Sequence, residues 1–223
     1  MSLKITFLGH SGFLFEGGGA RVVVDPFLTG NPAAKHKPSD LKCQYVAITH
    51  GHADHVGDAA DIAKANDATL IANYEICDHL ARKGVKKTDP GNIGGAIQTS
   101  FGSIAFTPAF HSSSYEGTYM GMPGGLVLKF PEATVYHLGD TSLFSDLKLM
   151  GELYKPDIAI IPVGDRFTMN PTHGATAAQW IRPKVAIPCH YATFPMLTSD
   201  ISAFQPQGVE TRVIKPGECW EYA

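Results

Sequence analysis

The apolar residues of the chain fall mostly into short continuous runs, which alternate with segments of helical spacing. Apolar runs of about four to eight residues, bounded by glycine, proline or polar clusters, are typical of buried strands. We therefore predict strands at residues 3–8, 12–16, 20–25, 45–49, 69–72, 97–100, 103–109, 125–130, 133–138, 157–162, 185–190, 210–214 and 218–222. Apolar spacing typical of a helix face predicts helices near residues 55–66, 74–83, 143–153, 172–181 and 199–205.

The predicted elements form two comparable halves, separated by a loop-rich stretch that reaches to about residue 96. No linker, low-complexity tract or block of charge divides the chain, so we expect a single domain over residues 1–223. Strands and helices in two such halves fit two packed sheets flanked by helices. Periodicity alone leaves other α/β arrangements open.

Composition narrows the classes of partner. The net charge of −3 offers no basic field for nucleic acid, so no nucleic-acid partner is expected. No run of about twenty apolar residues appears, and the chain begins directly with a strand pattern instead of a signal peptide. We therefore expect a cytoplasmic protein without a membrane partner. The cysteines are widely spaced without a C-x-x-C pair, which favours reduced thiols.

Residues 49–58 read THGHADHVGD, and they follow an apolar run and precede a helical pattern. His50 is expected at the end of a strand, His52 in the turn, and Asp54 and His55 at the start of the helix. Three imidazoles and a carboxylate in one turn can converge on a metal ion. Their nitrogen and oxygen donors suit zinc, manganese or iron, and the absence of thiolate argues against a closed structural zinc site.

This H-x-H-x-D-H motif resembles the signature of the metallo-β-lactamase fold superfamily, whose later ligands are a lone His, an Asp and a final His, each at the end of a strand. The chain supplies candidates for all three in that order, namely His111, Asp140 and His190. The resemblance spans nearly the whole chain. It implies a four-layer αββα sandwich, with two packed sheets between two layers of helices.

Smaller motifs narrow the resemblance to one branch of that superfamily. They are LGHSG from residue 8, DPF from residue 25, FTM from residue 167 and HYATFP from residue 190. Together they are similar to a small single-domain branch labelled metal-dependent hydrolase. Its better-understood relatives include an ascorbate-phosphate lactonase and a phospholipase D acting on N-acylated lipids, so the branch does not fix a substrate.

The resemblance implies a ligand set for two divalent metal ions, with zinc as first choice and manganese or iron as alternatives. It places His50, His52 and His111 on one ion, Asp54, His55 and His190 on the other, and Asp140 between them. Two ions can share a water and lower its pKa, which would present a bridging metal-bound hydroxide to a small-molecule ester, lactone or phosphodiester. Asp54 would also act catalytically by accepting a hydrogen bond from that water.

Four further residues have two interpretations each. His10 would contact substrate beside the metal cleft or be a hydrogen-bonded loop histidine. Asp25 would orient a ligand imidazole from behind or be a turn carboxylate before Pro26. Tyr115, in the segment 112–125, would belong to a substrate lid or to an ordinary flexible connection. Arg166 would bind an anionic substrate group or make a surface ion pair.

Two functions outside hydrolysis stay open. One is an iron-dependent oxidoreductase or dioxygenase on the same scaffold, and the other is a metal-binding regulatory module without turnover. The chain has no room after residue 190 for the helical domain of glyoxalase II, nor for the inserted domain of the β-CASP nucleases. We therefore expect a binuclear hydrolase of a small molecule, and formation of a homo-oligomer is left open.

Overall fold

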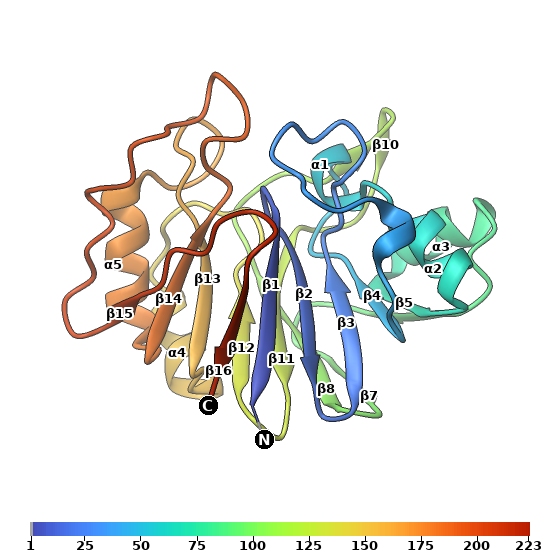
Figure 1. Ribbon diagram of the computed structural model, residues 1–223, viewed down its shortest axis with the longest axis horizontal. Helices are drawn as coiled ribbons and strands as arrows, with labels where there is room; N and C mark the ends of the chain where they lie inside the picture. The colour runs from blue at the N-terminus through green and yellow to red at the C-terminus, as the bar shows by residue number, and fades with distance from the viewer. Residues whose placement is uncertain (1) are drawn as a thin grey trace.

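Two seven-stranded sheets pack face to face in the computed structural model, which describes residues 2–223, and helices cover their outer faces (Figure 1). The strand order is β16-β1-β2-β3-β4-β5-β6 in the first sheet and β15-β14-β13-β12-β11-β8-β7 in the second. Helices α2 and α3 lie against the first sheet, whereas α5 lies against the second with α4 beside it. This arrangement confirms the predicted αββα sandwich.

The first sheet joins strands from the start, the middle and the end of the chain. Its strands are β1 (Leu3–Gly9), β2 (Gly12–Gly17), β3 (Ala20–Val24), β4 (Tyr45–Ala47), β5 (Thr69–Asn73), β6 (Thr88–Gly91) and β16 (Cys219–Tyr222). Strands β3 to β6 run parallel to one another, whereas β16, β1, β2 and β3 pair antiparallel. The helices of this half are η1 (Pro38–Asp40), α1 (Ala53–Val56), α2 (Ala59–Asn66) and α3 (Tyr74–Arg82).

The second sheet repeats this mixture of antiparallel and parallel pairing. Its strands are β7 (Ala96–Thr99), β8 (Gly102–Pro108), β11 (Gly124–Lys129), β12 (Thr134–His137), β13 (Ile158–Pro162), β14 (Val185–Cys189) and β15 (Glu210–Thr211). Strands β12 to β15 are parallel. The helices are α4 (Leu147–Tyr154) and α5 (Pro171–Ile181), and a separate hairpin contains β9 (Ser114–Tyr115) and β10 (Thr118–Tyr119).

Apolar side chains form three layers of core, one between the sheets and one under each pair of helices. Every residue of β13 and of β14 is buried, because the opposite sheet covers one face and helices cover the other. Strands covered on both faces are expected to read as continuous apolar runs. The strands predicted at 157–162 and 185–190 were based on such runs. Cys189, at the end of β14, is 1% exposed and lies in the core layer between the sheets.

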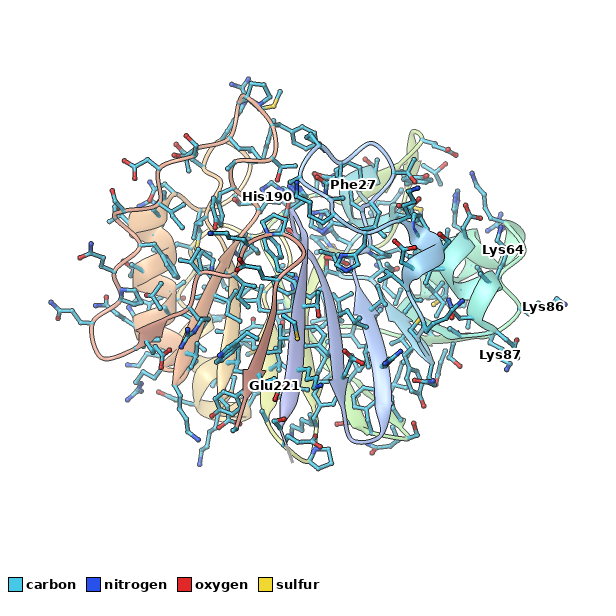
Figure 2. The ribbon with its side chains drawn as sticks, in the orientation of Figure 1. Phe27, Lys64, Lys86, Lys87, His190 and Glu221 are labelled. Carbon is cyan, nitrogen blue, oxygen red and sulfur yellow. The ribbon has the colours of Figure 1, made fainter. Side chains whose placement is uncertain are left out.

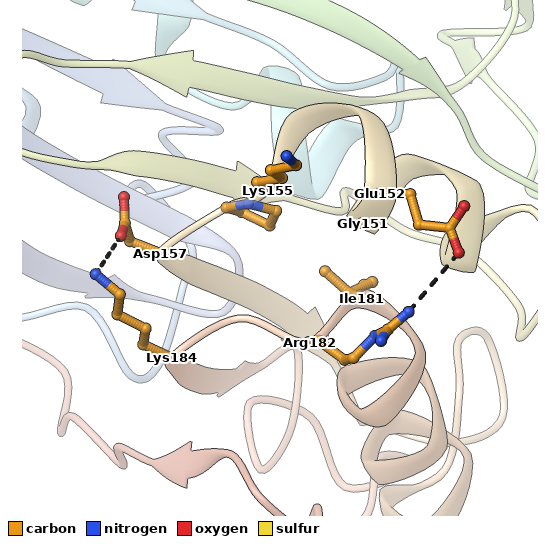
Figure 3. A pocket seen from close by; sticks show the side chains of 8 residues that line it. Gly151, Glu152, Lys155, Asp157, Ile181, Arg182 and Lys184 are labelled. Carbon is orange, nitrogen blue, oxygen red and sulfur yellow. Dashed lines mark ion pairs between the residues drawn. The ribbon is translucent and has the colours of Figure 1, made fainter.

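Helices α4 and α5 meet closely beside the amino ends of β13 and β14. A side chain at Gly151 of α4 would overlap the backbone of Ile181 in α5, so glycine permits the close crossing. Ion pairs flank this contact, from Arg182 to Glu152 and from Lys184 to Asp157 (Figure 3). Exposed pairs of this kind are worth only about 0–1 kcal/mol, so the apolar contact decides the packing.

Two expected helices differ in the structure, and one strand of the first sheet was not expected. The helix expected at 55–66 is two helices, α1 and α2, because Gly57 adopts φ +39° and lies against the backbone of Pro26 and Phe27. The helix expected at 199–205 is absent, and turns occupy that segment. Strand β6 was not predicted, because its sequence Thr-Asp-Pro-Gly is typical of a turn.

The carboxyl ends of the parallel strands lie at one end of the sandwich. His190 and Phe27 lie at this end, whereas Glu221 of β16 lies toward the other (Figure 2). Open α/β sheets bind ligands beyond the carboxyl ends of their strands, so this end is where a site is expected. None of the helices in residues 2–223 has the length and hydropathy needed to cross a membrane.

Candidate metal centre

Each predicted ligand follows the end of a strand, and these strand ends meet. His50, His52, Asp54 and His55 follow β4 and enter α1, His111 follows β8, Asp140 follows β12 and His190 follows β14. His10 follows β1 and Asp25 follows β3. The two sheets therefore contribute side chains from both sides of one cleft.

The donor atoms form three overlapping groups, and within each group they lie within 4.8 Å of one another. The groups are His50, His52 and His111; His50, His55 and Asp140; and His10, Asp54, His55 and His190. The first contains the three histidines that the sequence assigned to one ion. The third includes His10 beside the three residues assigned to the second ion.

Asp140 lies at the centre of these groups. Its Oδ2 atom is 2.9 Å from Nε2 of His190, 3.4 Å from Nε2 of His55 and 3.6 Å from Nε2 of His111. The Asp140 side chain is 3% exposed. Burial alone would raise the pKa of this carboxyl group, but the facing imidazoles of His190 and His55 hold it well below its usual value. Asp140 is therefore a buried anion with imidazole groups on several sides.

Three buried atoms of the cluster have no hydrogen-bond partner among residues 2–223. They are Nδ1 of His190, Nε2 of His55 and Oδ1 of Asp140, and the last two belong to residues grouped together in the cluster. Buried polar atoms are nearly always paired, because an unpaired one costs roughly 1–3 kcal/mol. Imidazole nitrogen and carboxylate oxygen are both ligands for divalent metals, so an ion would satisfy Nε2 of His55 and Oδ1 of Asp140. The residues present thus fit the metal that the donor set suggests.

Asp25 holds two of the histidines in a defined tautomer. Its Oδ2 accepts a hydrogen bond from Nδ1 of His55 at 2.7 Å and another from Oγ1 of Thr49 at 2.6 Å. The Thr49 hydroxyl, having donated its proton to Asp25, accepts from Nδ1 of His50 at 3.0 Å. Nδ1 of both His50 and His55 therefore donates away from the cluster, so Nε2 of each ring faces the cluster and offers a lone pair when the ring is neutral.

The side chain of His52 faces His50 through Nδ1, whereas His50 and His55 face the cluster through Nε2. Its Nδ1 lies 3.0 Å from Nε2 of His50, and its Nε2 lies 3.1 Å from the hydroxyl of Ser112. The rings of His50 and His111 are perpendicular, with centroids 5.1 Å apart. Three imidazole edges thus surround one point, as expected for the ligands of one ion.

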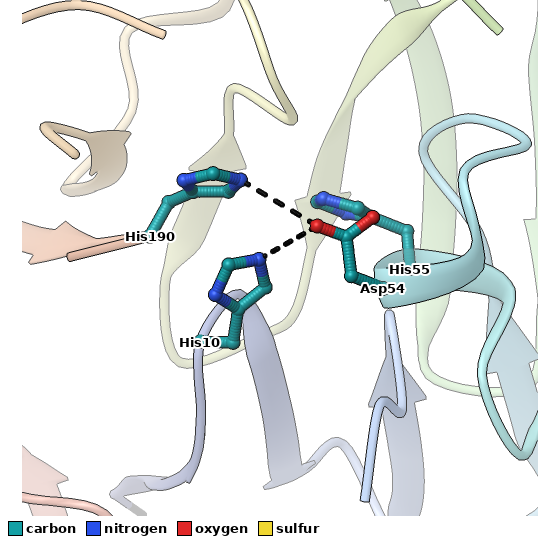
Figure 4. A group of neighbouring side chains, drawn as sticks. All are labelled: His10, Asp54, His55 and His190. Carbon is teal, nitrogen blue, oxygen red and sulfur yellow. Dashed lines mark hydrogen bonds and ion pairs between the residues drawn. The ribbon is translucent and has the colours of Figure 1, made fainter. Parts of the chain in front are cut away.

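His10 lies behind Asp54 (Figure 4), and it is 2% exposed. Its Nε2 is 3.0 Å from Oδ2 of Asp54, and its Nδ1 is 2.9 Å from the hydroxyl of Thr193. Burial lowers the pKa of His10 to about 4, so the ring is neutral at pH 7 and donates through Nε2 to Asp54. Because both ring nitrogens are engaged, His10 holds a carboxylate of the cluster and does not line the cleft.

Several residues of the cluster adopt left-handed backbone conformations. The φ angles are +59° for His10, +46° for Asp25 and +58° for His190. Such conformations cost on the order of 1–3 kcal/mol each in residues other than glycine, and they gather at functional sites. A hydrogen bond of 2.7 Å from the amide of His190 to the carbonyl of His10 joins two of these turns.

Burial also keeps most of the histidines neutral. It lowers the pKa of His50, which is fully buried, and of the half-buried His52 and His111. His55 differs, because the carboxylates of Asp140 and Asp25 outweigh burial and raise its pKa well above the usual value. The same carboxylates that attract a proton to His55 would attract a metal cation.

A cavity of about 360 Å³ opens onto the cluster. It is lined by His52, Asp54, His111, Ser112, Asp140, Phe167 and His190. Cavities of roughly 300–1,000 Å³ are typical of small-molecule sites. Larger hollows elsewhere on the surface lack such a cluster, so this smaller one is the candidate active site.

The two remaining candidates from the sequence lie apart from the cluster. Tyr115 in β9 packs its ring against His79 of α3, with centroids 5.6 Å apart, and Lys83 lies over the same ring. Arg166 is exposed in the loop after β13, and its guanidinium lies 5.6 Å from the ring of Phe167. Among the described residues no carboxylate pairs with Arg166, so the surface ion pair considered for it is not formed.

Thr49, Ser112, Thr193 and Phe167 contribute to the site without having been predicted. Thr49 and Ser112 directly adjoin the ligands His50 and His111, so their position in the sequence was a usable signal. Phe167 and Thr193 lie in the motifs FTM and HYATFP, but these motifs indicated only the branch of the superfamily, because the roles of the two residues depend on contacts between distant segments. His137 is buried and not a ligand, since its Nε2 donates to the carbonyl of Ser11 at 2.9 Å.

Comparison with known proteins gives a consistent result. Residues 4–190 match the family model described as the β-lactamase superfamily domain. A UPF0173 metal-dependent hydrolase of Geobacillus sp. (strain WCH70) is 46% identical over 97% of this chain and 98% of its own length. A second UPF0173 metal-dependent hydrolase, from Bacillus cereus (strain AH187), is 44% identical with the same coverage.

A solved structure is similar over its full length. It is Igni18, a metallo hydrolase from the archaeon Ignicoccus hospitalis KIN4/I, with a TM-score of 0.91 and 35% sequence identity. The match covers 100% of this chain and 99% of the other. The similarity therefore includes the strands and the loops that form the cleft.

Proposed function

Because the chain belongs to the β-lactamase superfamily and is a metal-dependent hydrolase of that superfamily, we propose that it cleaves a small-molecule ester, lactone or phosphodiester at a centre of two divalent ions. The observation that carries the proposal is the pair of unpartnered buried atoms, His55 Nε2 and Asp140 Oδ1, within a cluster of imidazoles. Zinc is the first choice of metal, with manganese or iron as alternatives.

The ligands divide between two positions in this proposal. His50, His52 and His111 hold one ion, Asp54, His55 and His190 hold the other, and Asp140 contacts both. The 4.8 Å grouping of the first three supports this division, as does the approach of Asp140 Oδ2 to three Nε2 atoms. When bound, two such ions would lower the pKa of a shared water and polarise the substrate.

Asp54 is the carboxylate that acts on the attacking water. Its side chain lines the cavity and is 31% exposed, more than the other carboxylates of the cluster. The hydrogen bond from His10 fixes Oδ2, which leaves Oδ1 to accept a hydrogen bond from water in the cavity. Burial would raise the pKa of Asp54, but the bond from His10 and the nearby His55 hold it below its usual value. The carboxylate is therefore ionised at neutral pH.

Hydrolysis assays with Asp54→Ala test this proposal. A panel of lactones, esters and phosphodiesters would be offered to the zinc- and manganese-reconstituted wild type, and any substrate found would be offered to the variant. We expect kcat to fall about a hundredfold to ten-thousandfold, as for loss of a positioned base. Asp61→Ala is the matched control, because Asp61 lies on the surface of α2 and its side chain is 75% exposed.

Full activity in Asp54→Ala would contradict the role given to this carboxylate. If the metal-loaded wild type hydrolysed nothing in the panel while it consumed oxygen with bound iron, the hydrolase proposal would fail.

A further inference from the structure

Two phenylalanine rings are exposed beside the candidate metal centre. Phe110 is 62% exposed and directly precedes His111, whereas Phe167 is 54% exposed and lines the cavity together with the ligands. Most of the chain's phenylalanines are buried in the core layers. Exposed apolar surface next to a candidate site can indicate where a ligand binds.

Phe110 is held firmly in its exposed position. Its amide donates to the hydroxyl of Thr141 at 3.0 Å, and its carbonyl accepts from the amide of Ser142 at 3.2 Å. Its ring packs against Phe144, with centroids 4.8 Å apart. Both hydrogen bonds reach the loop that carries Asp140. The backbone of Phe110 is therefore fixed to the loop that follows Asp140, and its ring is fixed against Phe144.

Phe167 is presented by a tight turn. The two residues before it, Asp165 and Arg166, have φ angles of +61° and +47°, which residues other than glycine rarely adopt. The amide of Asp165 donates to the carbonyl of Met169 at 3.0 Å, and the Met169 side chain is 2% exposed. A buried anchor and a strained turn thus place an apolar ring at the cavity wall, where strain is often functional.

The rest of the cavity lining is polar, since the lining residues other than Phe167 are histidines, carboxylates and a serine. A substrate that used only the metal centre would leave the phenyl rings in water. Covering them with an apolar group would be favourable, because apolar surface gains free energy in proportion to the area removed from water. The geometry therefore favours a substrate with a polar scissile group and an apolar neighbour.

We propose that Phe110 and Phe167 form an apolar subsite that binds an alkyl or aryl acyl group adjoining the scissile bond of the substrate. This inference rests on the proposed function, because it takes the scissile group to lie at the metal centre. It adds a substrate class, namely acyl compounds with an apolar chain or ring. Small polar esters and lactones without such a group are then poor substrates.

Binding of alkyl hydroxamates tests the subsite without turnover. A hydroxamate head group chelates the metal, and its alkyl chain extends away from it. The dependence of affinity on chain length therefore measures the apolar contact between the alkyl chain and the proposed subsite. We would titrate acetohydroxamate, hexanohydroxamate and octanohydroxamate into the zinc-reconstituted wild type by calorimetry. We expect at least about a tenfold gain in affinity from the shortest to the longest ligand, as for several buried methylene groups.

Three variants complete the experiment. Phe110→Ala and Phe167→Ala should each reduce the gain in affinity with chain length, while zinc content, which depends on the metal ligands, stays at the wild-type level. Leu153→Ala is the control, because Leu153 of α4 is 63% exposed and lies away from the strand ends that carry the ligands. It should keep the wild-type dependence on chain length.

Three outcomes would overturn the subsite: an affinity independent of chain length in the wild type, an equal dependence in both Phe variants, or no hydroxamate binding to zinc-loaded protein. None of these outcomes depends on hydrolysis. If the wild type hydrolysed no ester but showed the expected dependence, the proposed function would fail while the subsite stood.

Discussion

At the scale of single residues, Asp25 controls more of the site than its position in the sequence indicated. The sequence suggested that Asp25 could orient one ligand imidazole, and this carboxylate contacts His55 directly and His50 through Thr49. One buried carboxylate therefore sets the tautomers of two histidines, which the proposal assigns to different ions. Groups that orient ligands in this way tune metal affinity.

Asp25→Asn is expected to weaken binding at both positions, because one amide oxygen cannot replace two carboxylate oxygens. In Asp25, Oδ1 accepts from the amide of Thr49, and Oδ2 accepts from His55 and from the Thr49 hydroxyl. Losses of this kind amount to about 10–100-fold in affinity. Thr49→Val should weaken mainly the position that contains His50. Competition titrations with a chromogenic chelator, with Asp61→Ala as reference, would measure both affinities. Equal zinc affinity in wild type and Asp25→Asn would contradict the tautomer assignment.

At the scale of elements, the sequence predicted most strands and all the strand ends that carry ligands. The strand predicted at 157–162 is apolar along most of its length because both faces of β13 are covered in the structure. The motif in residues 49–58 predicted a convergence of donors, and the structure brings those donors together. Which ion each residue binds is still a prediction.

Other features depended on contacts that no local pattern encodes. The break at Gly57 arises where this residue meets the backbone of Pro26 and Phe27, more than twenty positions earlier in the chain. The position of His10 behind Asp54 depends on Thr193, which belongs to the opposite half of the chain. Tertiary contacts of this kind override local propensity, so sequence periodicity could not reveal them.

Gly164, two residues after β13 ends at Pro162, tests how the chain beyond a strand end positions a candidate ligand. A methyl group there would overlap the carbonyl oxygen of His190 and lie 3.0 Å from its Nδ1. We expect Gly164→Ala to displace His190, to destabilise the fold by about 1–3 kcal/mol and to weaken metal binding. Urea unfolding and zinc titration would measure the two effects.

Gly208→Ala is the matched control for this substitution. Gly208 has φ +76° with no atom within 4 Å of an added Cβ, so only the backbone conformation is penalised. Its variant should lose roughly 1–2 kcal/mol of stability from the left-handed backbone alone, with unchanged zinc affinity. Wild-type affinity in Gly164→Ala would show that the close contact does not position His190.

At the scale of the whole molecule, His137 joins the two sheets at the base of the site. Its Nε2 donates to the carbonyl of Ser11, in the turn after β1, and its Nδ1 accepts from the amide of Gly139. Burial lowers its pKa below the ordinary 6.5. The histidine is therefore a neutral structural link, and its protonation opposes folding.

This lowered pKa has a defined effect on stability. Below the unfolded pKa of 6.5 the unfolded chain binds more protons at this residue, so His137 loses its stabilising contribution as the pH falls from 6.5 toward its folded pKa. Replacing it by Gln should lower stability near pH 7 but flatten the decline in stability as the pH falls below about 6.5, by up to about 1.4 kcal/mol per pH unit. Urea unfolding across this range compares the two proteins, and parallel curves would refute the role.

The measurement that tests the central claim most directly is the metal content of protein purified without chelator, by elemental analysis of wild type, Asp140→Ala and Asp61→Ala. We expect about two zinc or manganese ions per chain in wild type and Asp61→Ala, and loss of at least one in Asp140→Ala. A single iron per chain, no metal, or undiminished content in Asp140→Ala would contradict a two-metal centre built around Asp140.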